Sequence, residues 1–319
     1  TIDSIHRFVI HPHSQVINAS TLQYPHDMTS TALIIGCALI AFSPTLSLLF
    51  LLTHKKAQLT IVVTTSAFSF LLSILFSSLI HLAFPTGSAA RSSPPLLLLP
   101  AIIFQTLARV GFVTVYRRVE AAVAHSIHLH ERQVGDTALS ESVKLRLELN
   151  DLSCGIASGV GFGLMKVMMQ YGTLLASEAS ENMGTLYQES CPVMPSLLNS
   201  AVMACLFSLL DIVLMLLTFY GVKGRFRGDS TNAPHYSGVL SRCCSCGGVL
   251  GPDGNQAVGA VLLAHTAATV STVANKANNG CLLALPLLAC VVVGTWAYFW
   301  MKVMPYFLPG RGMEGRHQD

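Results

Sequence analysis

Three polar side chains inside long apolar runs are the first candidates for chemistry in this sequence. Ser158 lies among glycines in "GIASGVGFG", Asp211 follows "LFSLL", and His265 lies in "AHTAATVST". A serine with a nearby histidine suits nucleophilic catalysis, in which the imidazole takes the hydroxyl proton. A carboxylate and an imidazole in apolar surroundings also suit proton transfer or hydrogen bonds between helices. We expect structural hydrogen bonding for Asp211 and His265, and a direct pair between them because they lie at similar depths in consecutive apolar runs.

The composition indicates which elements hold these residues. Of 319 residues, 52% are hydrophobic and 11% are charged, and the mean hydropathy is +0.56. Soluble domains carry about 25% charged residues. The sequence therefore predicts an integral membrane protein in contact with lipid, with no nucleic-acid partner.

Seven apolar stretches are long enough to cross a bilayer as helices, which takes about 20 residues. Helices are expected because backbone polar groups in lipid must be satisfied within the segment. The predicted fold is an all-α membrane protein, a seven-transmembrane helix bundle over residues 28–305, between a polar extension at 1–27 and a short cytosolic tail at 306–319. The expected spans are 30–53, 59–84, 95–116, 151–175, 196–222, 257–275 and 281–301.

The distribution of basic residues predicts the orientation of the bundle. With the N-terminus luminal or extracellular and the C-terminus cytosolic, the inside segments hold 14 Lys and Arg residues and the outside segments hold three. An excess of Lys and Arg in short loops marks the cytoplasmic side. Two long loops, 117–149 and 223–256, lie inside on this prediction, and the first could extend a helix.

A stripe of glycines marks the fourth span. Gly155, Gly159 and Gly163 recur every four residues and so share one face of a helix. Such stripes let helix backbones approach closely in lipid, so the stripe serves packing among the seven helices or docking of a partner subunit's helix. Gly161 lies off the stripe. A phosphate-binding loop is excluded because no strand precedes the glycines and no Lys-Ser/Thr pair follows them.

Three more polar residues lie within the predicted spans. Gln105 and Arg109 are four residues apart in the third span and share a face. Arg109 lies near enough to the inside surface for its long side chain to extend to the headgroups, and Lys166 can do the same toward the outside. We expect Gln105 and Arg109, like Asp211 and His265, to be buried polar residues with a structural role. The spans lack the continuous polar lining over several helices that would favour a transporter or channel.

The remaining candidates are modification sites. The nine cysteines are mostly scattered through apolar runs, which is not the pattern of a disulfide framework. Cys243, Cys244 and Cys246 lie close to the sixth span and are palmitoylation candidates, with unmodified thiols as the alternative. A zinc site would need His235 as a fourth ligand, and we expect no metal and no cofactor. Asn18 begins a glycosylation sequon in the N-terminal extension.

The placement of Ser158 and His265 resembles the Ser–His dyad of the rhomboid intramembrane proteases. The motifs depart from that family, which has Gly where this chain has Ile156 and glycines after the histidine where this chain has "TAATVST". A rhomboid-like serine protease therefore stays as an alternative function, together with a multi-pass transporter. An aspartyl intramembrane protease would need two membrane carboxylates, and only Asp211 is deep.

The order of motifs along the spans resembles the anterior pharynx-defective subunit family of gamma-secretase. In the first span "GCALIAFSP" matches the family's Gly-Cys, Ala-Phe and Pro positions, and in the fourth "GIASGV" matches closely. The third span carries the family's Gln-x-x-x-Arg as Gln105 and Arg109. The sixth places His265 on a family histidine within "AHTAATVSTVAN", and the seventh contains "GTWAY". Met28 stands where that family's chain begins, so residues 1–27 are expected to be an upstream extension.

Two departures from the family pattern concern the candidate sites. The family has a second membrane histidine in its fifth helix, and an ungapped alignment on "LNSA" puts Asp211 at that position. The family's first stripe glycine falls on Asp151, while Gly163 extends the stripe in the other direction. A polar group in helix five and a glycine stripe in helix four are therefore expected, with an altered stripe register.

The resemblance implies a scaffold function. In that family presenilin supplies both catalytic aspartates, so the resemblance implies no catalytic residue in this chain and an assembly role for the glycine stripe. It implies assembly first with nicastrin and then with presenilin and the presenilin enhancer subunit, in support of the processing of single-pass membrane proteins. It also implies residence in the endoplasmic reticulum, the Golgi and the plasma membrane.

Overall fold

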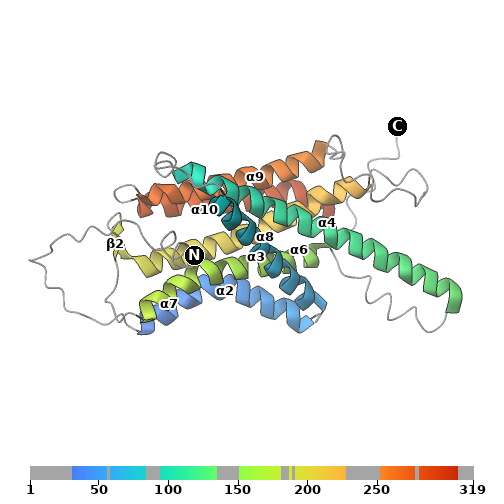
Figure 1. Ribbon diagram of the computed structural model, residues 1–319, viewed down its shortest axis with the longest axis horizontal. Helices are drawn as coiled ribbons and strands as arrows, with labels where there is room; N and C mark the ends of the chain where they lie inside the picture. Colours follow the sequence, from blue (N-terminus) through green and yellow to red (C-terminus); the bar gives the residue numbers. More distant parts are fainter. Residues whose placement is uncertain are drawn as a thin grey trace, which may run out of the picture.

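Seven membrane-crossing helices form one elongated bundle. The computed structural model describes residues 31–55, 58–83, 94–134, 151–180, 187–188, 191–227, 252–276 and 280–307. Within these ranges, seven helices are long and apolar enough to cross a membrane, over stretches of 19 to 27 residues. Most run along the long axis of the molecule (Figure 1). The predicted seven-helix fold is therefore confirmed.

The helices follow one another with two short strands between the fourth and fifth spans. The first three spans are α2 (Thr31–Lys55), α3 (Gln58–Ala83) and α4 (Pro94–Val134). The fourth span is α6 (Asp151–Val167), the π-helix η2 (Met168–Gly172) and α7 (Thr173–Ser180). After β1 (Tyr187–Gln188) and β2 (Cys191–Pro195) come α8 (Ser196–Arg227), α9 (Pro252–Val273) with the 3-10 turn η4 (Ala274–Lys276), and α10 (Cys281–Tyr298) continuing through the π-helix η5 (Phe299–Val303) into α11 (Met304–Phe307).

Helix α8 is the centre of the bundle. Every residue from Leu210 to Phe219 is buried, so the helix is enclosed on all sides, which is the mark of a core helix. It packs against α2, α6, α9 and α10, and α6 in turn packs against α3. The polar side chains carried by α6 and α8 are therefore held in the interior.

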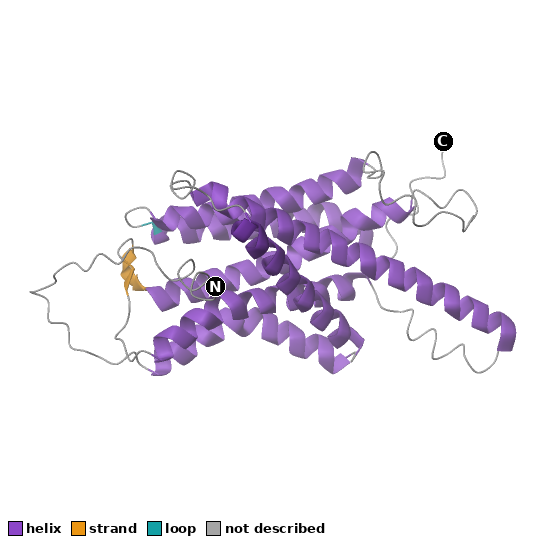
Figure 2. Ribbon diagram, in the orientation of Figure 1, coloured by secondary structure: helices purple, strands orange, loops and turns teal. Residues whose placement is uncertain are grey.

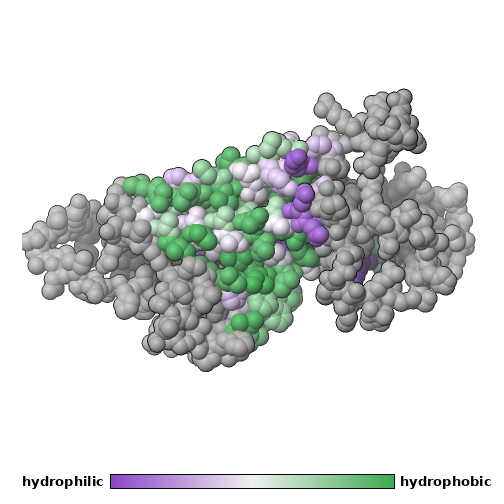
Figure 3. All heavy atoms as spheres, turned by 90° about the horizontal axis from the view of Figure 1, so that it is seen from above, coloured by the Kyte–Doolittle hydropathy of each residue, from purple (hydrophilic) through white to green (hydrophobic). Residues whose placement is uncertain are grey.

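The outer helices present apolar side chains outward. Phe50 on α2 is 73% exposed and Met301 in η5 is 71% exposed. Figure 3 shows hydrophobic side chains over the middle of the visible face, with hydrophilic ones gathered toward the end where α4 projects. Lipid is the natural solvent for such a surface, because a soluble monomer rarely exposes contiguous apolar area on this scale.

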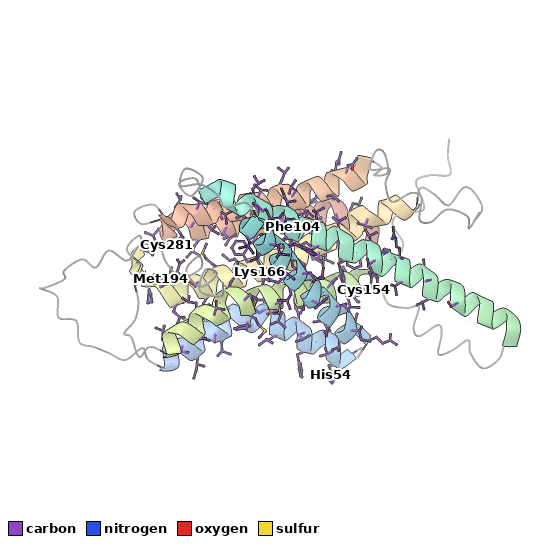
Figure 4. All side chains as sticks on the ribbon, viewed as in Figure 1. His54, Phe104, Cys154, Lys166, Met194 and Cys281 are labelled. Atoms are coloured by element: carbon purple, nitrogen blue, oxygen red, sulfur yellow. A yellow bond between two sulfur atoms is a disulfide. The ribbon has the colours of Figure 1, made fainter. Side chains whose placement is uncertain are left out.

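One end of the bundle carries a hairpin and a disulfide. Strands β1 and β2 pair antiparallel and lie only at this end (Figure 2). Cys191 at the start of β2 is bonded to Cys281 at the start of α10, with Cα atoms 5.8 Å apart. Figure 4 places Cys281 and Met194 at this end and His54 at the other. The expectation of no disulfide framework thus missed one bond, because cysteines 90 residues apart meet only once the helices are packed.

The opposite end carries an ionic contact between α4 and α6. Arg117 Nη1 donates to Asp151 Oδ1 and to Glu120 Oε2, each at 2.8 Å. Helix α4 continues from there to Val134, past the expected end of the third span at 116, and projects beyond the other helices (Figure 1). Asn18, Cys243, Cys244 and Cys246 lie outside the described residues.

The disulfide gives a direct test of which end of the bundle meets an oxidising compartment. Disulfides persist in the endoplasmic reticulum lumen and outside the cell and are rare in the cytosol. After free thiols are blocked in intact membranes, reduction should expose two further thiols to a maleimide-polyethylene glycol gel shift. The Cys191→Ser/Cys281→Ser double variant should show no such increment, and Cys290→Ser should keep it. Equal labelling of wild type and double variant after reduction would show that the bond does not form.

Candidate functional site

A polar cluster in the core joins four helices. Each helix contributes one side chain, and all four are buried, with at most 3% of any residue exposed: Arg109 from α4, Lys166 from α6, Asp211 from α8 and His265 from α9. Figure 4 shows Lys166 midway along the bundle, far from both ends. Charged groups at such a depth are costly unless they are paired, so their partners decide what the cluster does.

The guanidinium of Arg109 is the bridge of the cluster. Its Nη2 donates a hydrogen bond to Asp211 Oδ1 in a fully buried ion pair. Its Nη1 lies 3.3 Å from His265 Nδ1. Arginine has donors only, so Nδ1 of His265 accepts and its ring proton sits on Nε2. One side chain of α4 thereby connects α8 to α9.

This arrangement corrects the expected direct pair between Asp211 and His265. Within the described part of the chain, Asp211 accepts a hydrogen bond from Arg109 and forms a further ion pair with Lys166. The side chain of His265 contacts Arg109. Similar depth along two helices does not determine the rotation of each helix about its own axis. The forked guanidinium, with five donors, can serve two acceptors at once and so occupies the position between them.

Lys166 is the fourth member of the cluster. Its Nζ lies 3.2 Å from Asp211 Oδ2 and 4.6 Å from the centre of the Phe207 ring. The contact is a close ion pair without hydrogen-bond geometry among the described residues. A helical side chain points back toward the N-terminus of its helix, here from Lys166 toward the middle of the bundle. Lys166 therefore does not extend to the headgroups, although its position in the span would allow it.

Arg109 is fully buried, so of the two placements that its position allowed, the structure shows the buried one. Its guanidinium carbon lies 4.6 Å from the centre of the Phe162 ring on α6. The buried carboxylate and this aromatic face together replace headgroup contacts, and a desolvated cation–π contact contributes about 2 kcal/mol. Gln105, one turn earlier on α4, was also expected to be buried but is only half-buried. Its Oε1 has no hydrogen-bond partner among the described residues, so it stands apart from the cluster.

The groups that could perform nucleophilic catalysis are engaged elsewhere. Ser158 is fully buried, and its Oγ donates to the carbonyl of Cys154 in its own helix at 2.5 Å. His265 faces Arg109, so no hydrogen bond joins this serine to this histidine in the described residues. The same residues contain no group of three or more His, Cys, Asp or Glu side chains placed to hold a metal ion.

The glycine stripe of α6 meets the backbone of α8. A Cβ added at Gly155 would lie 2.8 Å from Leu216 Cδ2, and one added at Gly159 would lie 2.6 Å from Ile212 Cα. The corresponding distance from Gly163 to the Ser208 carbonyl oxygen is 3.3 Å. Of the two roles left open, the structure shows packing within the chain. A partner helix could use this face only if α8 moved away.

A fourth glycine, which lies off the stripe, makes the tightest contact of all. A Cβ at Gly161 would overlap the carbonyl oxygen of Val63 and the hydroxyl oxygen of Ser66, both on α3. Helix α6 is therefore bare on two sides, toward α8 and toward α3. In the sequence, Gly161 lies two residues from both Gly159 and Gly163. Residues two positions apart in a helix face different sides, so Gly161 belongs to another face of α6.

Comparison with known proteins identifies the family of this bundle. The family model described as "Aph-1 protein" matches residues 32–304, a range that contains all seven spans and the whole polar cluster. This chain belongs to the Aph-1 family. A curated relative from Arabidopsis thaliana, described as "Gamma-secretase subunit APH1-like", is 26% identical over 282 residues, covering 88% of this chain and 96% of the relative. The family resemblance drawn from the motifs is confirmed, and this Aph-1 family chain is an integral, multi-pass membrane protein.

Proposed function

We propose that this chain is a non-catalytic scaffold and assembly subunit of a gamma-secretase-type intramembrane aspartyl protease complex. The family and the description of the Arabidopsis relative support membership of such a complex. The observation that supports the scaffold role is the polar cluster. In it, Arg109 contacts both Asp211 and His265, and Lys166 forms an ion pair with Asp211. These groups join helices to one another, and none is poised as a nucleophile or a general base.

The proposed partners are nicastrin, presenilin and the presenilin enhancer subunit. The complex would process single-pass membrane proteins, with presenilin supplying the catalytic aspartates. The apolar outer faces of α2, α3 and α10 offer surface for partner helices in the bilayer. The proposed location is the endoplasmic reticulum, the Golgi and the plasma membrane.

The proposed orientation has the N-terminus luminal or extracellular and the C-terminus cytosolic. Two independent observations support it. The Cys191–Cys281 bond lies at the end predicted to be luminal, where the redox environment keeps disulfides oxidised. In the sequence, the segments assigned to the cytosolic side hold 14 Lys and Arg residues against three in the outside segments, as expected for this orientation.

Ser158→Ala tests the scaffold proposal against a rhomboid-like protease. The variant should leave cleavage of a transmembrane substrate unchanged in the assembled complex, because the Ser158 hydroxyl is bonded to its own helix backbone. The wild-type chain purified alone should cleave nothing. Cleavage by the isolated chain that disappears in the variant would assign the chemistry to Ser158 and overturn the proposal.

A further inference from the structure

One stripe of α6 carries no side chains where the helix meets α8. Gly155, Gly159 and Gly163 place no side chain between the two backbones. In water or in lipid, interdigitating side chains normally fix how far one helix slides along another. After a slide of one turn, about 5.4 Å, two of these three glycines would still lie opposite α8. Packing on this face therefore discriminates weakly between neighbouring registers.

One long side chain lies at the end of this stripe. Lys166 lies three residues after Gly163, so it belongs to the same side of α6. Its ammonium contacts two residues of α8 that are four apart and share a face, Phe207 through its ring and Asp211 through Oδ2. The pair is buried on both sides. Lys166 is thus the long polar side chain that reaches from the glycine face of α6 to α8.

We propose that Lys166 fixes the register of α6 against α8. A slide of one turn would carry Nζ several ångströms from Asp211 and leave a buried ammonium without its carboxylate, which is strongly unfavourable. The best-attested use of a polar group in an apolar helix interface is to specify register. The inference goes beyond the scaffold function, because it concerns the internal geometry of the chain and is measured on the full chain without partners.

Disulfide cross-linking between introduced cysteine pairs can measure the register directly. A Cβ at Gly163 would lie 3.5 Å from Ser208 Cβ, within the range of about 3.5–4.5 Å that a disulfide requires. Gly163→Cys with Ser208→Cys therefore reports the native register. Gly163→Cys with Ala204→Cys, or with Ile212→Cys, reports a slide of one turn in either direction. Cys205→Ala removes the native thiol that follows Ala204 in the sequence.

The expected result is a loss of register selectivity when the Lys166 charge is removed. With Lys166 present, mild oxidation in membranes should cross-link the 163–208 pair at least about tenfold more than either shifted pair, a ratio equivalent to ~1.4 kcal/mol. Lys166→Met should bring one shifted pair to a comparable yield, Lys166→Arg should keep the native pattern, and Lys302→Met should match the wild type as the control for loss of a lysine.

The proposal is overturned if the native register persists without the Lys166 charge. A Lys166→Met chain that cross-links only at 163–208 would overturn the proposal. If that variant does not accumulate, Lys166→Gln takes its place, and a single native register in the Gln variant would show that the charge pair does not set it. Failure of both variants to accumulate would assign Lys166 to folding as a whole and would also overturn the register role.

Discussion

Replacing Asp211 with Asn is expected to remove most of the folded subunit from the membrane. The substitution keeps the shape of the side chain but leaves Arg109 and Lys166 as two buried cations without a carboxylate. Removing one partner of a buried ion pair costs about 3–5 kcal/mol. Total stabilities are about 5–15 kcal/mol, so the loss is a large fraction of the whole. Steady-state abundance and the melting temperature of the chain in mild detergent measure it.

A matched carboxylate-to-amide change supplies the control. Glu120→Gln removes a carboxylate that also pairs with an arginine, but its side chain is 40% exposed, so the expected loss is about 0–1 kcal/mol. Combining Asp211→Asn with Lys166→Met should recover part of the stability, because it removes one of the two stranded cations. An Asp211→Asn chain as stable as the Glu120→Gln chain would contradict the account of the cluster.

Gly161→Ala is expected to have the second-largest effect. The new methyl group would overlap the Val63 carbonyl oxygen, which belongs to a helix backbone and cannot rotate away. Helix α3 must then shift as a unit, and overpacking of this kind costs about 1–3 kcal/mol. Gly159→Ala should behave similarly against Ile212 Cα. Melting temperature in detergent and retention of co-purifying partners are the measurements.

Glycines at open positions isolate the effect of contact from the effect of helix propensity. Gly111 and Gly294 have nothing within 4 Å of an added Cβ. Alanine at either position should be neutral or stabilising by up to about 1 kcal/mol, because alanine is the better helix former. Gly163→Ala should fall between, at a closest distance of 3.3 Å. Equal stability of the Gly161→Ala and Gly294→Ala chains would rule out the close approach of α3.

The spans and the glycine face could be predicted because their signals are local. Twenty apolar residues in sequence suffice to cross a bilayer, whatever the neighbouring helices do. The spacing of Gly155, Gly159 and Gly163 fixes a common face from helix geometry alone. The presence of polar residues at 109, 211 and 265 was likewise visible, since each interrupts an apolar run.

The partners of those residues could not be predicted, because they depend on helix rotation and packing. From sequence alone, the side chains of Arg109 and Lys166 could each extend to a membrane surface. They pair with Asp211 instead because the packed helices place its carboxylate within their reach. Cys191 and Cys281 become neighbours only when two helix ends meet. The sequence shows that Gly161 lies off the stripe, but it does not indicate that the neighbouring helix on that side is α3.

The measurement that tests the central claim most directly is purification of the tagged, full-length chain from native membranes in mild detergent, with identification of the proteins that remain bound. We expect presenilin and nicastrin homologues to co-purify in stable proportion. We also expect the preparation to cleave a transmembrane substrate only while the presenilin aspartates are intact. A chain that purifies without a presenilin homologue, or that cleaves the substrate by itself, would contradict the proposal that this protein is a non-catalytic scaffold.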